Sequence, residues 1–96
     1  MSNIYIDWSK MITSEMKAEK EDAELLAAVE AELVKRRLEA DKVIVPLQDA
    51  VDLEMATPEE SALLLEWKRY RVYLSRVPQQ VGYHKVITWP EKPADA

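Results

Sequence analysis

The most regular apolar pattern in the chain lies between residues 57 and 77, which read TPEESALLLEWKRYRVYLSRV. Five large apolar side chains recur there at steps of four, three, four and three residues, so they share one face of a helix. These side chains belong to Leu63, Trp67, Tyr70, Leu74 and Val77. Polar and charged residues fill most of the positions between them. The pattern predicts an amphipathic helix whose apolar face is buried.

The same segment carries signals for where this helix begins and ends. Thr57 can accept a hydrogen bond from an exposed backbone amide as the N-cap, and Pro58 suits the first helical position. Glu60 stands three residues after Thr57, which completes the sequence of a capping box. Because Pro78 cannot continue a helix, we expect the helix to run from residue 57 to about residue 76.

A longer helical pattern precedes this one. No glycine or proline interrupts residues 14–45, and Thr13 or Ser14 can serve as the N-cap, so a helix of about 30 residues is predicted. Its apolar residues follow a seven-residue repeat at two positions, with Arg36 as an exception. The two sets are Leu26, Leu33, Ala40 and Leu47, and Val29, Arg36, Val43 and Ala50.

Pro46 marks the end of the long segment. Proline removes a backbone hydrogen bond and clashes with the preceding turn, so we expect the helix to kink or end there and a short helix to follow over residues 47–54. Residues 14–24 are mainly charged, and we expect them to be solvated, with packing that begins near Leu25. The predicted fold is mainly α: a long N-terminal helix folds back as a helical hairpin on the second helix, residues 57–76.

The chain divides into three parts under this interpretation. Residues 1–13 form an apolar N-terminal lead that caps the long helix, and residues 14–77 form the helical hairpin domain. Residues 78–96 form a short irregular C-terminal segment and tail. This last part holds the only glycine of the chain, and we expect an extended stretch at residues 86–89.

Charge is distributed unevenly along the 96 residues, whose formal net charge is -5. Residues 1–66 hold seven basic and sixteen acidic side chains, whereas residues 67–90 hold five basic and no acidic ones. Opposite charges on successive elements favour packing of the second half against the first, or against an acidic partner.

The residues of common catalytic and metal sites are scarce. There is no cysteine, and His84, the one histidine, lies in a predicted loop beside no predicted carboxylate. Gly82 stands alone, so no glycine-rich phosphate loop exists. Carboxylates spread over a helix surface are more typical of a solvated face than of a calcium or magnesium site. We therefore expect no enzyme activity, no cofactor and no metal.

Nucleic acid and membrane are also disfavoured as partners. Residues 67–76, WKRYRVYLSR, interleave basic and aromatic side chains as many nucleic-acid binders do. On a helix, however, these two kinds of side chain lie mainly on different faces, and the acidic first half would repel a phosphate backbone. No segment reaches the roughly 20 apolar residues that span a bilayer. We expect a cytoplasmic protein.

Four residues are candidates for contact with a protein partner. Arg69 and Tyr73 fall off the apolar stripe of the predicted helix, so we expect both to be exposed. Tyr83 and Trp89 lie in the irregular C-terminal segment, where they can either dock back onto the helices or anchor a partner. We predict that all four take part in partner binding.

Three motifs follow one another along residues 46–93. They read PLQDAVDLEMATPEE, then LLLEWKRYRVYLSRV, then WP after an irregular loop. In this order and spacing the chain resembles the C-terminal part of the tail fibre assembly proteins of tailed bacteriophages, a chaperone-like family. Members of that family are usually longer and have a separate N-terminal domain, so the resemblance implies a short member.

The resemblance implies that the protein binds the C-terminal end of a phage or prophage tail fibre and assists its folding or attachment without covalent chemistry. It implies a location in the host cytoplasm and leaves open whether the protein stays on the virion tail fibre. The residues themselves leave an alternative, a self-associating helical structural or regulatory phage protein. Its basis is the repeat from Leu26 to Ala50, which has more apolar surface than one helix of about 20 residues can cover and so favours a homodimer through the long helix.

Overall fold

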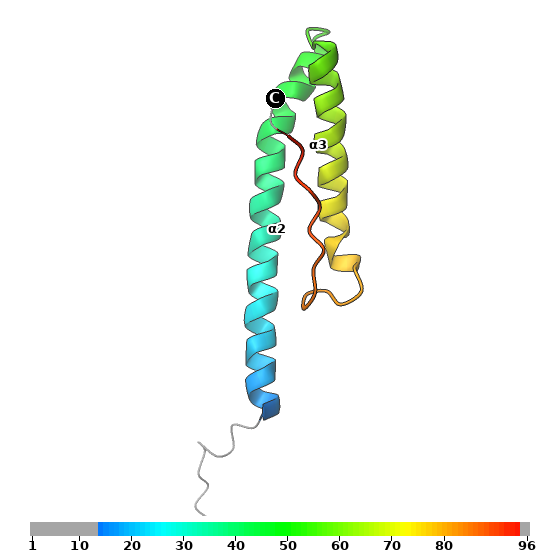
Figure 1. The fold of residues 1–96 in the computed structure, drawn as a ribbon. Helices are drawn as coiled ribbons and strands as arrows, with labels where there is room; N and C mark the ends of the chain where they lie inside the picture. Colours follow the sequence, from blue (N-terminus) through cyan, green and yellow to red (C-terminus); the bar gives the residue numbers. More distant parts are fainter. Residues whose placement is uncertain (1–13, 95–96) are drawn as a thin grey trace, which may run out of the picture.

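The fold is a hairpin of two α-helices, seen in a computed structural model that describes residues 14–94. Helix α2 (Ser14–Asp52) is followed by α3 (Pro58–Arg76) and by a short 3-10 helix, η2 (Val77–Gln79). The two α-helices run side by side in opposite directions, and the first turns of α2 extend beyond α3 (Figure 1). The described residues contain no strand, so the predicted mainly α hairpin is confirmed. The predicted N-terminal lead lies outside the described residues.

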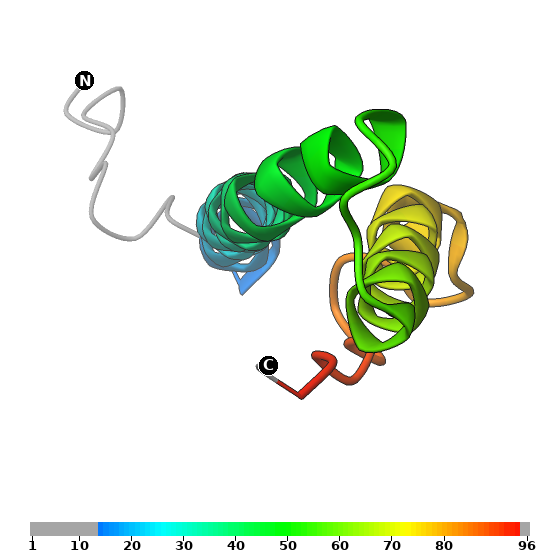
Figure 2. The same cartoon turned by 90° about the horizontal axis from the view of Figure 1, so that it is seen from above.

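Helix α2 continues through Pro46 as one helix. The prediction of a separate short helix over residues 47–54 is therefore wrong. The predicted kink is present, because the last turns of α2 run at an angle to the earlier ones (Figure 2). Proline costs the helix one backbone hydrogen bond, but Ile44 and Leu47 on either side of it are both buried. Their packing on α3 holds the two parts of α2 in one helix.

The connection between the helices begins with a hydrogen-bonded helix end. Glu54 adopts a left-handed conformation with a φ of 57°. The amide of Met55 donates to the carbonyl of Ala50 (2.7 Å), and the amide of Glu54 donates to the carbonyl of Val51 (3.0 Å). These two bonds form a Schellman motif, which satisfies carbonyl groups at the end of α2 and turns the chain away from it.

The predicted capping box is present at the start of α3. The Thr57 hydroxyl accepts a hydrogen bond from the amide of Glu60 (3.1 Å), and the Glu60 carboxylate accepts one from the amide of Thr57 (2.9 Å). Pro58 occupies the first helical position, as predicted. The cap and the Schellman motif together fix the turn that directs α3 back along α2.

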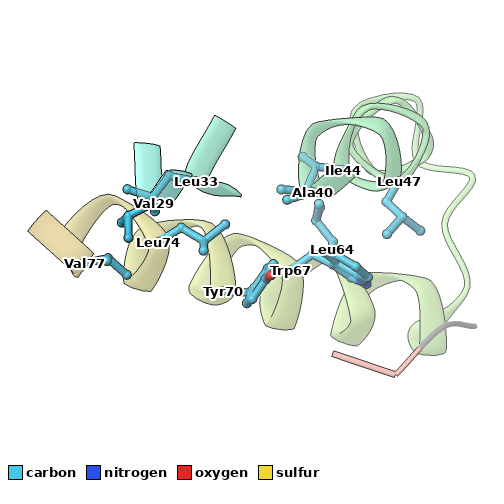
Figure 3. Close-up of a cluster of buried hydrophobic side chains, with 10 residues drawn as sticks. All are labelled: Val29, Leu33, Ala40, Ile44, Leu47, Leu64, Trp67, Tyr70, Leu74 and Val77. Atoms are coloured by element: carbon cyan, nitrogen blue, oxygen red, sulfur yellow. The ribbon is translucent and has the colours of Figure 1, made fainter. Parts of the chain in front are cut away.

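The core is a single layer of side chains between the helices. Its members are Val29, Leu33, Ala40, Ile44 and Leu47 from α2, Leu64, Trp67, Tyr70 and Leu74 from α3, and Val77 from η2 (Figure 3). The apolar face predicted for residues 57–77 is confirmed at four of its five positions, Trp67, Tyr70 and Leu74 in α3 and Val77 in η2. The exception is Leu63, which packs at the edge of the core, while its neighbour Leu64 is buried.

Trp67 is the largest side chain in this core, and it is completely buried. Its ring meets that of Tyr70 edge-on, with centroids 5.7 Å apart. We expect Trp67→Ala to lower the free energy of unfolding by about 3–5 kcal/mol, because it leaves a cavity between the helices. Urea denaturation followed by circular dichroism measures this loss. The matched control is Leu65→Ala, on the exposed face of the same helix, with an expected change below about 0.5 kcal/mol.

A substitution at Glu54 is expected to stabilise the protein. A residue with a Cβ in the left-handed region costs about 1–2 kcal/mol, whereas glycine adopts it freely but loses more chain entropy on folding. We therefore expect Glu54→Gly to raise the free energy of unfolding by about 0.5–1 kcal/mol, and Glu54→Ala to give no such gain. Thermal unfolding of both variants measures the difference. A lower Tm for Glu54→Gly than for the parent would contradict this account of the turn.

Candidate functional site

The chain after η2 folds back along the hairpin. Residues 80–94, named here the C-terminal strap, run from the end of α3 beside both helices toward the middle of α2 (Figure 1). The strap begins with a turn in which Gly82 has a φ of 88°. The side-chain amide of Gln80 closes this turn, since it donates to the carbonyl of Thr88 (2.8 Å) and accepts from the amide of Thr88 (2.9 Å). From residue 87 the strap has no regular secondary structure.

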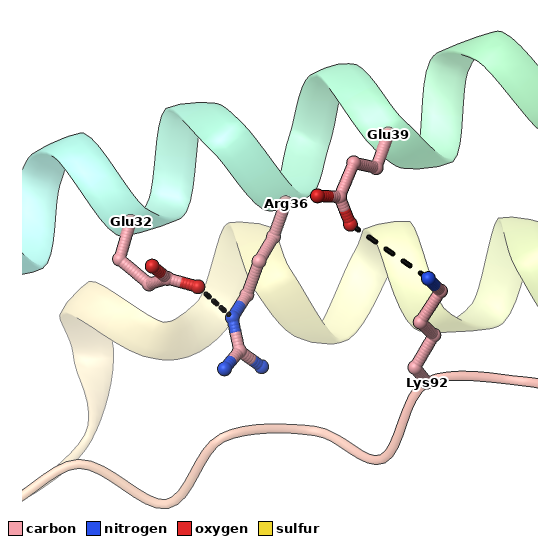
Figure 4. Close-up of polar contacts among 4 residues, drawn as sticks. All are labelled: Glu32, Arg36, Glu39 and Lys92. Carbon is pink, nitrogen blue, oxygen red and sulfur yellow. Dashed lines mark hydrogen bonds and ion pairs between the residues drawn. The ribbon is translucent and has the colours of Figure 1, made fainter.

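Arg36 fastens the strap to α2. Its Nε lies 2.7 Å from a carboxylate oxygen of Glu32, one helical turn earlier (Figure 4). Its guanidinium carbon lies 4.3 Å from the ring centroid of Trp89 in the strap. A cation over an indole face is attracted by the electron density of the ring. Arg36, the charged exception in the apolar repeat of α2, therefore has a structural role: its guanidinium packs on the ring of Trp89.

The contact between Arg36 and Glu32 shifts both pKa values. Partial burial works to lower the pKa of Arg36, but the hydrogen bond with Glu32 and the nearby Tyr70 outweigh it, and the pKa is raised. The hydrogen bond from Arg36 lowers the pKa of Glu32. A carboxylate with a lowered pKa stabilises the fold above its unfolded pKa. Its contribution is lost only as the pH falls through the lowered value, so this contact is fully formed at neutral pH.

Three further contacts hold the strap against α2. Lys92 Nζ lies 3.8 Å from a carboxylate oxygen of Glu39 (Figure 4). Asp22 Oδ1 lies 2.9 Å from His84 Nε2 and 3.7 Å from Lys85 Nζ. The expectation that His84 lies beside no carboxylate is therefore wrong, because the beginning of the strap lies against Asp22 of α2. The expectation that residues 14–24 are solvated and that packing begins near residue 25 is also wrong at Asp22, which makes these contacts.

The contacts between elements follow the uneven charge of the sequence. Arg71 of α3 pairs with Asp41 of α2 at 3.1 Å, and the strap pairs with α2 through Lys85 and Lys92. In each pair within residues 17–94 that joins two elements, α2 supplies the acid and the later chain supplies the base. The second half of the chain packs against the first, as the charge pattern favours.

The structure brings two of the four predicted partner-binding residues together on one surface. Arg69 and Tyr73 are exposed on α3 and line a groove of about 270 Å³ between α3 and the end of the strap. The other lining residues are Glu66, Tyr70, Glu91, Lys92, Pro93 and Ala94. Tyr73 also borders a second groove of about 360 Å³, which reaches Arg76 and Pro90. Tyr73 thus stands where two open grooves meet.

The other two predicted residues lie closer to the core. Tyr83 and Trp89 are partly buried and pack against the core cluster, so both dock back onto the helices. Their contact with a partner stays a prediction. The strap side of the grooves, including Lys92 and Pro93, was missed by sequence reasoning, because no periodic pattern indicates where an irregular segment lies. Arg76 could have been found from its spacing of seven residues from Arg69.

The described residues around Arg69 and Tyr73 form an exposed surface beside two grooves. Within residues 17–94, no three histidine, cysteine or acidic side chains come together in a way that could hold a metal ion. Neither of the described α-helices has the length and apolar character to cross a membrane. What the surface provides is aromatic area, cations and open grooves, which are features of protein recognition.

Arg36→Ala tests how the strap is held. The change removes the cation over Trp89, so we expect the strap to open more often and its backbone amides to exchange hydrogen faster, while α2 and α3 keep their protection. Hydrogen exchange followed by mass spectrometry measures this. Arg37→Ala, at the exposed neighbouring arginine, is the control. Equal protection of the strap in both variants would show that Arg36 does not hold it.

Comparison with known proteins finds relatives of one kind. The chain is 56% identical over 54 residues to the probable tail fiber assembly protein of Acyrthosiphon pisum secondary endosymbiont phage 1, a match that covers 56% of this chain and 34% of the relative. It is 50% identical over 66 residues to the tail fiber assembly protein of Escherichia phage lambda, covering 67% of this chain and 33% of that protein. It is 49% identical over 55 residues to tail fiber assembly protein U of Escherichia phage Mu, covering 57% and 29%.

These matches concern part of each relative, since the chain spans about a third of their length. No solved structure matches the chain significantly. The Caudovirales tail fibre assembly protein model (lambda gpK) matches residues 3–94. That match extends well beyond residues 46–93, on which the resemblance was based, and the resemblance is confirmed. The chain belongs to the Caudovirales tail fibre assembly protein family.

Proposed function

We propose that this protein assists the assembly of a phage tail fibre by binding the C-terminal end of the fibre protein in the host cytoplasm, without covalent chemistry. The observation that supports this most is the family match over residues 3–94. The relatives from phages lambda and Mu carry tail fiber assembly in their names. The described residues add an exposed surface around Arg69 and Tyr73 that the fold itself does not use.

The shape of this surface supports a chaperone-like contact. Tyr73 is half-exposed between two open grooves, and Arg69 and Lys92 line one of them. Tyrosine and arginine often dominate the binding energy of protein interfaces, because they bury a large area and still form hydrogen bonds. A short fibre segment that lies along α3 can fill both grooves and leave the core undisturbed.

A second candidate is self-association through the long helix. The repeat from Leu26 to Ala50, which was its basis, is buried in the core at Val29, Leu33, Ala40 and Leu47, so the outer face of α2 is the surface left for it. This face points away from α3, and it carries exposed apolar side chains at steps of four, three, four and seven residues. They are Ala27, Ala31, Val34, Leu38 and Val45. A shallow apolar groove of about 450 Å³ lies at one end of it, beside Pro46. This spacing is typical of a helix that pairs with another helix. Sizing at several protein concentrations tests the candidate, and a monomer throughout contradicts it.

Co-expression tests the assembly role. The fibre protein encoded in the same phage genome is expressed with and without this chain, and soluble trimeric fibre and a co-eluting complex are measured on a sizing column. We expect more soluble trimer or a stable complex when the chain is present. If neither quantity changes, the chain does not assist this fibre, and self-association becomes the better proposal.

Tyr73→Ala and Arg69→Ala test the surface. Both side chains are exposed, so we expect the free energy of unfolding to change by less than about 0.5 kcal/mol. Fibre binding should weaken by roughly tenfold in each variant if these residues are interface anchors. Calorimetric titration measures binding, with Lys42→Ala on α2 as the control. Unfolding of either variant would show that the exposed face of α3 was misplaced.

A further inference from the structure

A second stripe runs along α3 on the side away from the core. Leu65, Arg69, Val72 and Arg76 follow one another at steps of four, three and four residues and are all exposed. Leu65 keeps 61% and Val72 43% of its surface accessible, so both are available to a partner. Apolar and basic residues therefore alternate along a face of α3 that contacts neither α2 nor the core.

The charge of this stripe is not balanced within the described part of the chain. Of the basic residues in α3, Arg71 pairs with Asp41, whereas Lys68, Arg69 and Arg76 form no ion pair with any residue from 17 to 94. Glu66 and Glu91 line the groove beside Arg69 without reaching ion-pair distance. The outer face of α3 thus combines exposed apolar area with two cations, Arg69 and Arg76, that form no ion pair within residues 17–94.

We propose that the outer face of α3 binds an acidic amphipathic helix of the fibre protein. This inference rests on the proposed function and specifies the chemistry of the partner. Carboxylates seven residues apart on the partner meet Arg69 and Arg76, which are separated by about 10 Å along α3. Apolar side chains between those carboxylates cover Leu65 and Val72. Tyr73, beside the stripe, supplies an aromatic anchor at the edge of the contact.

The spacing favours a helix as the partner. Steps of three and four residues form a seam that matches the same steps on a second helix, whereas an extended strand presents side chains at a period of two. The charge favours a protein over a nucleic acid. A phosphate backbone has no apolar surface to cover Leu65 and Val72, and the net charge of -5 repels it.

A second copy of this chain fits the surface less well. The available apolar helix face on another copy is the outer face of α2. Exposed side chains of both signs border it, the cations Lys35, Arg37 and Lys42 and the carboxylates Glu30 and Asp49, so it complements Arg69 and Arg76 only in part. A helix with carboxylates at every matching position complements both arginines.

Charge reversal tests the proposal on the intact chain. The probes are the fibre protein, a labelled synthetic helix of about three heptads with leucine and glutamate in the matching pattern, and the same helix with lysine for glutamate. We expect the double variant R69E/R76E to weaken binding of the fibre and of the glutamate helix by at least tenfold. R69K/R76K should keep most of the binding. The matched control is R37E/K42E, which makes the same change in net charge on α2, and it should bind within about twofold of the parent.

The outcomes separate this inference from the proposed function. If the parent binds fibre and R69E/R76E binds it equally well, the inference fails while the assembly role stands. If only the glutamate helix binds, in a manner that depends on both arginines, the acidic-helix chemistry stands and the assembly role fails. Equal binding of the lysine helix, or a dimer of the parent that R69E/R76E dissociates, would each overturn the proposed partner. So would failure of both the fibre and the glutamate helix to bind.

Discussion

The hairpin depends on the burial of one indole ring between two helices. Trp67 is completely buried and meets Tyr70 edge-on, and Lys92 of the strap lies 5.9 Å from its ring centroid. Its Nε1 has no hydrogen-bond partner among the described residues, and an unpaired buried donor typically costs about 1–3 kcal/mol. Burial and the contacts of the ring, not a hydrogen bond, therefore stabilise this residue. The next largest fully buried side chains are Leu74 and Val77, and neither has the volume to fill the space that the indole occupies.

Electrostatic contacts position the strap on this thin core. α2 offers carboxylates along its length, and the strap contacts them at Asp22 and Glu39. Exposed pairs of this kind contribute at most about 1 kcal/mol each, so they cannot hold the helices together without the apolar seam. Together with the cation of Arg36 over Trp89, they decide instead where an irregular segment lies along an already formed hairpin.

Sequence periodicity predicts the helices far better than it predicts the site. The burial of Trp67 and Leu74 follows directly from their spacing, and the capping box at Thr57 fixes the start of α3. At Pro46 the predicted kink is present (Figure 2), but the predicted separate helix after it is wrong, because the burial of Ile44 and Leu47 on both sides of the proline outweighs one lost hydrogen bond. The strap has no period, so its contacts could not be predicted. Arg69 and Tyr73 could be placed on an exposed face, but the grooves beside them depend on where the strap returns.

The two faces of α3 contribute differently to stability. The inner face sets the stability of the hairpin, whereas Leu65, Arg69, Val72 and Arg76 on the outer face contribute little to it. Substitutions on the outer face can therefore accumulate singly while the chain continues to fold. Such a helix is evolvable: its surface can change residue by residue while the buried face that stabilises the hairpin is kept.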